Sequence, residues 1–171
     1  DQPRERAEPA QALDQHVLRH QHHGAGDHEA ADDQREDQVP AGEVPIGAVI
    51  AIDERVVARG YNQPIGAVDP TAHAEVVALR AAAREVGNYR LTGARLYVTL
   101  EPCLMCVGAL VHARVAEVIY GAAEPKTGAL VSTVRALESP GLNHRFAVTS
   151  GVLEQQCRDL IQEFFREKRR T

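Results

Sequence analysis

Four side chains that can bind a metal or move a proton occur in two short motifs. His73 and Glu75 belong to a His-Ala-Glu motif, and Cys103 and Cys106 belong to Pro-Cys-Leu-Met-Cys. Two cysteines three residues apart on the first turn of a helix can point at one ion, and an imidazole with two thiolates suits Zn²⁺. Three protein ligands leave a fourth position for water, as in catalytic zinc sites. The sequence therefore predicts one zinc ion per chain, bound by His73, Cys103 and Cys106.

Glu75 is predicted to carry protons beside this metal. It follows His73 by two residues, about 200° around a helix, so both side chains reach one ion only if the ion lies off the helix end. The first turn of a helix provides that geometry. A zinc-activated water is a strong nucleophile at neutral pH, and Glu75 would take up and return its proton.

Two other residues could complete the ligand set, but another role is favoured for each. Cys157 lies on the apolar stripe of the last predicted helix and is interpreted as a core residue. His112 lies at a helix end and is interpreted as a C-terminal cap partner. A strand followed by Cys-x-x-Cys and a helix is also typical of thiol redox proteins. The upstream His-x-Glu motif favours a catalytic zinc site over a redox module or a non-enzymatic zinc-binding module.

Strands and helices alternate along the part of the chain that carries these motifs. The crossover helix between the third and fourth strands predicts that these two strands are parallel, and the first two strands predict a hairpin that turns at Asp53-Glu54. Apolar runs or alternation predict strands at 47–52, 55–61, 96–100, 118–120 and 147–149. Helical spacing and start signals predict helices from Asp69-Pro70 to about Gly87, from Pro102 to His112, and over 153–165.

Composition excludes several classes of protein. Apolar residues make up 44% of the chain, yet no apolar run is long enough to cross a membrane and no apolar segment resembles a signal peptide. Three cysteines do not form a disulfide framework, so we expect a cytoplasmic protein that does not associate with membranes.

These motifs are the signature of zinc-dependent nucleobase deaminases. Over about residues 43–170 the sequence resembles the bacterial tRNA-specific adenosine deaminases. The resemblance implies an α/β protein with a three-layer α/β/α, cytidine-deaminase-like fold and a central five-stranded mixed sheet. It also implies a homodimer that converts the wobble adenosine of tRNA anticodons to inosine. The segments that carry it are Asn62-Gln-Pro-Ile, Asp69 to Glu75, Thr99 to Ala109, Lys126-Thr-Gly128 and Gly141 to Arg145.

The resemblance further implies where the substrate binds. Asn62 would form a hydrogen bond with the flipped base, and Glu124, Lys126 and His144 are further candidates for substrate contacts. Glu124 stands where the family more often carries aspartate. The basic residues expected to meet tRNA phosphates are Lys126, Arg166, Lys168, Arg169 and Arg170. The nearest alternative is a deaminase of a free base or nucleotide, of the cytosine or guanine type, because the same zinc chemistry serves both.

The N-terminal segment differs in composition from the rest of the chain. Residues 1–43 hold 11 acidic and 4 basic side chains, whereas residues 44–171 hold 13 acidic and 15 basic ones. The slightly positive net charge of residues 44–171 is compatible with a nucleic-acid partner. Five of the eight histidines lie before Glu43, and we expect a polar segment that is helical after Pro9 or disordered. It stands where the family usually has an amphipathic helix, either as a divergent helix, a tail or a mis-assigned start. The chain is therefore divided into an acidic, His-rich segment over 1–42 and a zinc-dependent deaminase domain over 43–171.

Overall fold

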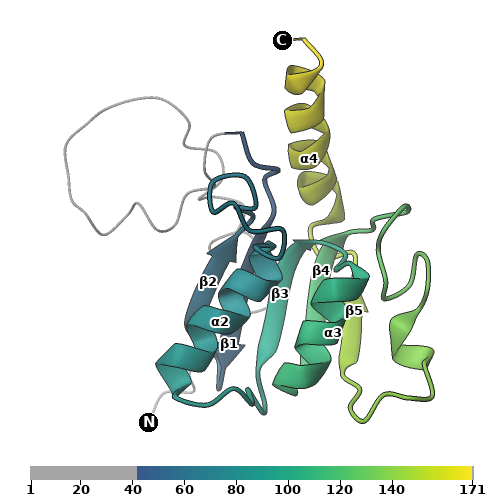
Figure 1. Cartoon of the computed structure of the whole chain (residues 1–171). Coiled ribbons are helices and arrows are strands. Elements are labelled where there is room, and N and C mark those ends of the chain that lie inside the picture. The colour runs from purple at the N-terminus through teal and green to yellow at the C-terminus, as the bar shows by residue number, and fades with distance from the viewer. Residues whose placement is uncertain (1–41, 171) are drawn as a thin grey trace, which may run out of the picture.

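Five strands form one sheet in the part of the chain that the structure describes, residues 42–170 (Figure 1). This computed structural model gives the strand order β2-β1-β3-β4-β5. The N-terminal helix and the His-rich segment predicted before Gly42 lie outside the described residues. The strands are β1 (Gly47–Ile52), β2 (Arg55–Tyr61), β3 (Arg95–Leu100), β4 (Glu117–Ala122) and β5 (Ala147–Ser150).

The sheet has an antiparallel half and a parallel half. β1 pairs antiparallel with β2 and β3, whereas β3, β4 and β5 are parallel. The hairpin turns at Asp53 and Glu54, whose φ angles of 50° and 62° suit the two central positions of a type I′ turn. The predicted hairpin, parallel crossover and mixed five-stranded sheet are confirmed.

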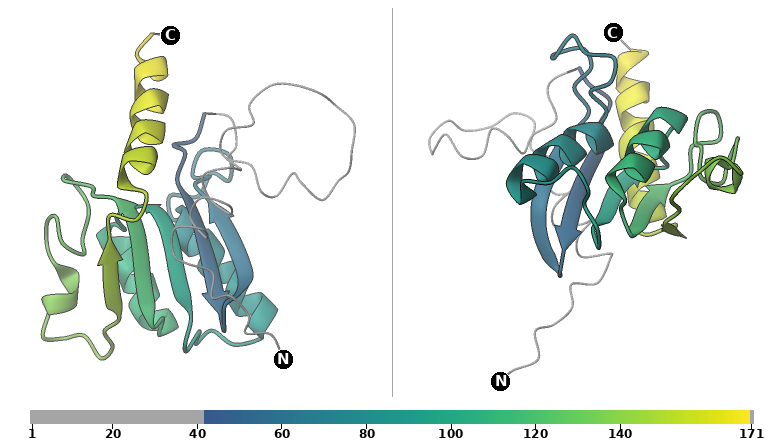
Figure 2. Two further views of the ribbon diagram at one scale, coloured as in Figure 1. Left: turned by 180° about the vertical axis from the view of Figure 1, so that it is seen from behind. Right: turned by 60° about the horizontal axis from the view of Figure 1, so that its bottom comes forward.

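Helices cover the sheet from both sides. α2 (Ala74–Val86) and α3 (Leu104–Ala113) pack side by side on one face, and α4 (Glu154–Lys168) packs from the other side at the carboxyl end of β4 (Figure 2). Gly121 of β4 permits this contact, because a Cβ atom there would lie 2.3 Å from the Sγ of Cys157 in α4. A short 3₁₀ helix, η4 (Ala136–Glu138), lies in the long connection before β5. This arrangement confirms the predicted three-layer α/β/α fold.

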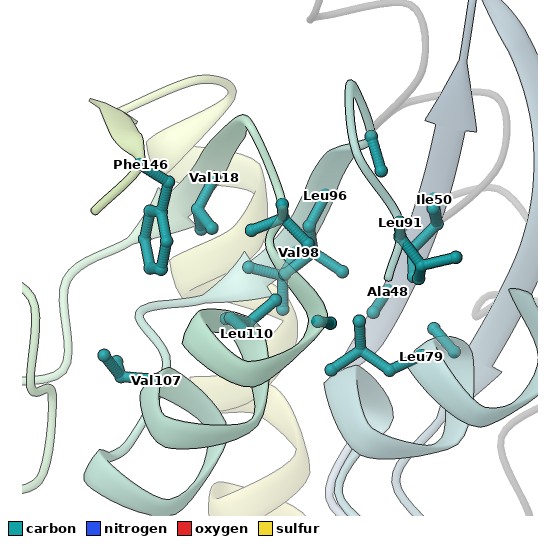
Figure 3. Packing of buried hydrophobic residues seen from close by; sticks show 14 of the residues in the cluster. Ala48, Ile50, Leu79, Leu91, Leu96, Val98, Val107, Leu110, Val118 and Phe146 are labelled. Carbon is teal, nitrogen blue, oxygen red and sulfur yellow. The ribbon is translucent and has the colours of Figure 1, made fainter. Parts of the chain in front are cut away.

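Alternation along β3 decides which side chains enter which layer. Leu96 and Val98 face α2 and α3, where they pack with Leu79 and Leu110 in the main core (Figure 3). Tyr97, between them, points to the opposite face and joins a second buried cluster. Successive side chains of a strand point to opposite faces, so one strand stabilises both layers.

The start of α2 differs from the prediction. The pair Asp69-Pro70 predicts a helix with Asp69 as its N-cap, but α2 begins at Ala74 and its N-cap is His73. Asp69 instead accepts hydrogen bonds from the backbone N and Oγ1 of Thr71. The turn that Asp69 caps does not continue into α2, because His73 is extended with a ψ angle of 151°, so the helix starts four residues later than predicted.

The other helix boundaries are close to those predicted. α2 ends at Gly87, whose φ of 69° places it in the left-handed conformation common after helices. α3 begins at Leu104, two residues after Pro102, with Cys103 as its N-cap. None of the helices within residues 42–170 combines the length and apolar character needed to span a membrane.

Gly60 of β2 lies where the sheet and α2 approach each other closely. A Cβ atom there would be 2.4 Å from both the backbone O of Ala74 and the backbone N of Ala78. We expect Gly60→Ala to lower the free energy of unfolding by about 1–3 kcal/mol, because the helix must shift away from the strand. Chemical denaturation would measure the change. Gly141→Ala is the control, since no atom lies within 4 Å of its added Cβ; equal losses in both variants would contradict the close approach.

Candidate active site

Three potential ligand atoms converge at the starts of α2 and α3. His73 is the N-cap of α2, Cys103 is the N-cap of α3, and Cys106 lies in the first turn of α3. The Nδ1 of His73 lies 3.6 Å from the Sγ of each cysteine, and the two Sγ atoms are 3.6 Å apart. The three residues predicted from the sequence therefore form one triangle of donor atoms.

This triangle fits a tetrahedral zinc ion. Ligand atoms bound to zinc at 2.0–2.3 Å and at tetrahedral angles stand roughly 3.5–3.8 Å apart. One nitrogen and two sulfur donors match the preference of zinc and leave one coordination position for another molecule. Across residues 42–170, no other group of three His, Cys, Asp or Glu side chains meets in this way. The structure thus contains one candidate metal centre in its described part.

The two residues weighed as further ligands do not join the triangle. Cys157 is fully buried in a separate cluster with Ala122 and Leu160, which confirms its interpretation as a core residue. Burial raises the pKa of its thiol to about 11. His112 is exposed in the last turn of α3, at the opposite end of the helix from Cys103.

The two thiols of the triangle are electrostatically unequal. A hydrogen bond from the Cys106 side chain, opposed by burial and assisted by His73, lowers the pKa of Cys103 to about 5. The same hydrogen bond, together with burial, raises the pKa of Cys106. Cys103 is therefore the thiol that ionises more readily, and Cys106 is the one that resists ionisation. Because zinc binds thiolates, binding would release the proton of Cys106.

Glu75 lies buried in the first turn of α2, beside the triangle. Burial raises the pKa of its carboxyl group to about 7; the negative charge of Cys103 adds to the rise, while its own backbone amide and His73 oppose it. A carboxyl group with a pKa near the working pH can both accept and donate a proton, as general acid–base catalysis requires. These surroundings suit the proton carrier predicted from the sequence.

Asn62 follows β2 directly and supports the start of α2. Its buried side chain accepts a hydrogen bond through Oδ1 from the backbone N of Ala74, at 3.3 Å. His73 makes no side-chain capping bond of its own, so Asn62 satisfies an amide that the N-cap residue leaves unpaired. Asn62 is thereby placed beside His73 and Glu75, where the sequence predicts a contact with the base.

Sequence analysis did not identify Glu101, which organises the segment of residues 124–132 next to Cys103. This segment is joined to Cys103 by a backbone bridge at Gly128. The available signal was an acidic residue between a buried strand and the Pro-Cys motif, where water cannot solvate a charge. The carboxylate of Glu101 accepts hydrogen bonds from the backbone N atoms of Glu124, Leu130, Val131 and Ser132 and from the hydroxyl of Ser132.

Glu101 is expected to make stability depend on pH. Burial opposes its ionisation, but hydrogen bonds from Ser132, Val131 and Glu124 hold the pKa of this carboxyl group below its usual 4.5. A group whose pKa is lower in the folded state stabilises the fold above its unfolded pKa, and this contribution disappears as the pH falls through the folded-state pKa. We expect Glu101→Gln to lower the free energy of unfolding by about 1–3 kcal/mol at neutral pH.

Denaturation of the wild type and of Glu101→Gln at neutral pH and in acid would test this. The difference between the two proteins should shrink as the pH falls from 4.5 through the lower folded-state pKa, because the unfolded wild-type chain binds the proton first and the folded carboxylate then becomes neutral, like the glutamine. A difference that stays constant over this range would show that the charge of Glu101 does not support the fold.

The remaining predicted substrate contacts divide into two groups. Glu124 and Lys126 lie in the segment held by Glu101, where Glu124 accepts a hydrogen bond from the backbone N of Lys126 and the Lys126 side chain is exposed. His144 lies elsewhere and donates through Nε2 to the backbone O of Val115, beyond the carboxyl end of α3. A helix of ten residues is about 15 Å long, so His144 is separated from the metal centre by the length of α3.

A three-layer α/β/α domain with a His-Cys-Cys centre at two helix starts and a buried glutamate beside it defines the class of zinc-dependent nucleobase deaminases. Comparison with known proteins agrees. A family model described as MafB19-like deaminase matches residues 26–169. Over 129 residues the chain is 46% identical to a tRNA-specific adenosine deaminase from Haemophilus influenzae, and the match covers 75% of each chain. The chain belongs to the family of tRNA-specific adenosine deaminases.

Two solved structures extend this comparison. One, from a study of A-to-I editing by tRNA:A34 deaminases at the wobble position, is 46% identical with a TM-score of 0.67, over 68% of this chain and 85% of that chain. The other is a guanine deaminase from Nitrosomonas europaea, 19% identical with a TM-score of 0.65, over 96% of this chain and 88% of that chain. At that identity the second match supports the fold alone.

Proposed function

We propose that this chain is a zinc-dependent hydrolase that deaminates adenosine to inosine at the wobble position of tRNA anticodons. The observation that carries the proposal is the triangle of His73, Cys103 and Cys106 with the buried Glu75 beside it. The 46% identity with a relative named tRNA-specific adenosine deaminase supports adenosine in tRNA as the substrate. Because tRNA is a cytoplasmic substrate, the chain would act in the cytoplasm.

The roles of the residues follow from their surroundings. Zinc held by His73, Cys103 and Cys106 would activate a water molecule at its open position. Glu75 would take the proton of that water, deliver it to ring N1 of adenine and later protonate the departing ammonia. Ala74 donates to Oδ1 of Asn62, and the Nδ2 group of the same side chain would donate a hydrogen bond to the base.

One experiment distinguishes this function from its alternatives. The purified enzyme with zinc would be supplied with tRNA, free adenosine, cytidine and guanine, and the products identified by mass spectrometry. We expect inosine in tRNA and far slower turnover of the free compounds. Efficient turnover of guanine or cytidine would instead support the small-molecule alternative. Zinc-free protein with a Cys103–Cys106 disulfide under the same conditions would support the redox alternative.

Binding of tRNA also requires positive charge near the site. Lys126 is exposed beside the metal centre, and α4 rises from the same edge of the sheet and carries four exposed basic residues at its end (Figure 1). Contacts with phosphates release counterions, so binding should weaken steeply with salt. Replacing the four basic residues near the end of the chain by glutamine should make tRNA binding less dependent on salt and leave zinc bound. These residues are Arg166, Lys168, Arg169 and Arg170.

The homodimer expected for the family has a suitable surface on α3. Leu104 and Val134 are largely exposed apolar residues on the two sides of a groove of about 290 Å³ between α3 and residues 134–142. Burial against a second copy of this chain would remove that apolar surface from water. Light scattering should detect a dimer, and Leu104→Glu should shift it toward the monomer; a monomer in the wild type would reject the proposed dimer.

A further inference from the structure

The loop that joins β2 to α2 presents an apolar tip beside the candidate active site. It runs over residues 63–72, between Asn62 and the metal ligand His73, above the edge of the sheet from which α4 rises (Figure 1). At its tip, 72% of Ile65 and 89% of Val68 are exposed. Exposed apolar side chains at the mouth of a site are candidates for contacts with the substrate.

The loop is fixed in place by hydrogen bonds at its base and near its tip. A single carboxylate oxygen of the buried Glu43 accepts from the backbone N atoms of Ile65 and Gly66, both at 2.8 Å. The backbone N of Gln63 donates to the backbone O of Ala72, which closes the loop. Because the tip is anchored at these points, the backbone that carries its apolar side chains is held in one position.

Val68 occupies a backbone conformation that is unfavourable for its residue type. Its φ angle is 50°, in the left-handed region, where a β-branched residue is an outlier and Asn or Gly fits more easily. The two neighbouring hydrogen bonds, from Val68 to Ile65 and from Asp69 to Pro64, keep it there. Because the Val68 side chain is exposed, it contributes little to the core, and burial does not explain why a valine occupies this strained position. Strained backbone of this kind is often found at binding sites, which suggests that the apolar side chain has a binding role.

Charge indicates which part of an RNA this tip can meet. Between Asn62 and His73 the sequence contains no lysine or arginine, and its one acidic residue, Asp69, is paired with Arg80 of α2. A tip without positive charge does not attract phosphates. Apolar side chains can instead contact the faces of unstacked bases, and wedges of this kind separate neighbouring bases in other nucleic-acid complexes.

We propose that Ile65 and Val68 contact the base next to the target adenosine and hold it unstacked while the target nucleotide enters the site. This inference rests on the proposed function and makes the two residues determinants of nucleotide context. Enzymes that act on a flipped base commonly select their substrates through such neighbouring nucleotides.

The test uses the zinc-loaded full chain and RNA hairpins that carry the anticodon loop. The variants are Val68→Asn, which suits the left-handed backbone, and Ile65→Ser; the control is Val86→Asn, an exposed valine at the other end of α2. Hairpins with the base 5′ or 3′ of the target replaced by an abasic site complete the set. Zinc content and melting temperature are measured for each protein.

We expect Val68→Asn to lower kcat/KM for the intact hairpin about tenfold, the size of one base contact, with zinc content unchanged and a melting temperature equal to or above that of the wild type. On one of the two abasic hairpins the wild type should lose a similar factor, and Val68→Asn should cause no further loss. Val86→Asn should match the wild type on every substrate.

Three results would overturn the inference. Unchanged kcat/KM for the intact hairpin in both loop variants would show that the tip makes no productive contact. Equal losses on intact and abasic hairpins would place the tip against something other than that base, such as a second copy of the chain. If the wild type forms no inosine in any hairpin or in tRNA, the proposed function itself is wrong. This outcome is distinguishable from the other two because it is seen in the wild type alone, without the loop variants.

Discussion

Cys103→Ala is expected to remove zinc and activity together. The substitution leaves only His73 and Cys106 of the triangle, and it removes the more acidic of the two thiols. Without the metal, the pKa of the attacking water is no longer lowered toward neutrality, so hydroxide is not available as the nucleophile. We therefore expect turnover to fall by more than about 10⁴-fold. Elemental analysis of the purified protein and an inosine assay on tRNA would measure both effects.

Cys157→Ala provides the matched control for this prediction. Cys157 is as buried as Cys106 but lies in the cluster under α4, so its replacement should lower stability modestly and leave one zinc per chain. Full zinc occupancy in Cys103→Ala, or loss of zinc in Cys157→Ala, would show that the ligands have been assigned wrongly.

Glu75→Gln is expected to retain zinc and lose turnover. Glutamine has nearly the same shape as the carboxyl group and remains neutral in the buried position, but it cannot accept and return a proton. General acid–base catalysis is worth about 10²–10⁴ in rate, and we expect a loss of that size in kcat. Single-turnover assays at saturating tRNA would measure it.

The control for Glu75→Gln is Glu85→Gln, a change of the same type at an exposed position near the end of α2. This variant should keep normal zinc content and rate. Near-normal deamination by Glu75→Gln, with zinc content and melting temperature equal to the control, would exclude Glu75 as the proton carrier.

Much of the fold could be predicted because its strands carry strong local patterns. Leu96 and Val98 alternate with Tyr97 and Thr99, as expected for a strand that turns one set of side chains toward α2 and α3 and the other toward the opposite layer. The start of α2 could not be predicted in the same way. Asp69-Pro70 is compatible both with a helix start and with a turn, and the extended conformation of His73 that separates this turn from α2 is visible only in three dimensions.

The candidate site divides along similar lines. His73, Cys103 and Cys106 could be predicted because a His-x-Glu motif and a Cys-x-x-Cys motif, each at the start of a helix, together are typical of a metal site. Glu101 was not found, since a single acidic residue in a sequence does not reveal that four backbone amides converge on it from residues 124–132. The position of His144 at the far end of α3 likewise depends on a long-range hydrogen bond to Val115.

Metal binding would also affect the stability of α2 and α3, because the N-cap residues of both helices belong to the triangle. An N-cap side chain normally accepts a hydrogen bond from an amide of the first turn, worth about 1 kcal/mol, and neither His73 nor Cys103 does so. Their side chains are committed to the triangle, so the first turns of both helices depend on whatever holds that triangle together. Local opening, as measured by amide exchange, would then begin at these two turns in the metal-free protein, while the core around Leu96 and Leu110 stayed protected.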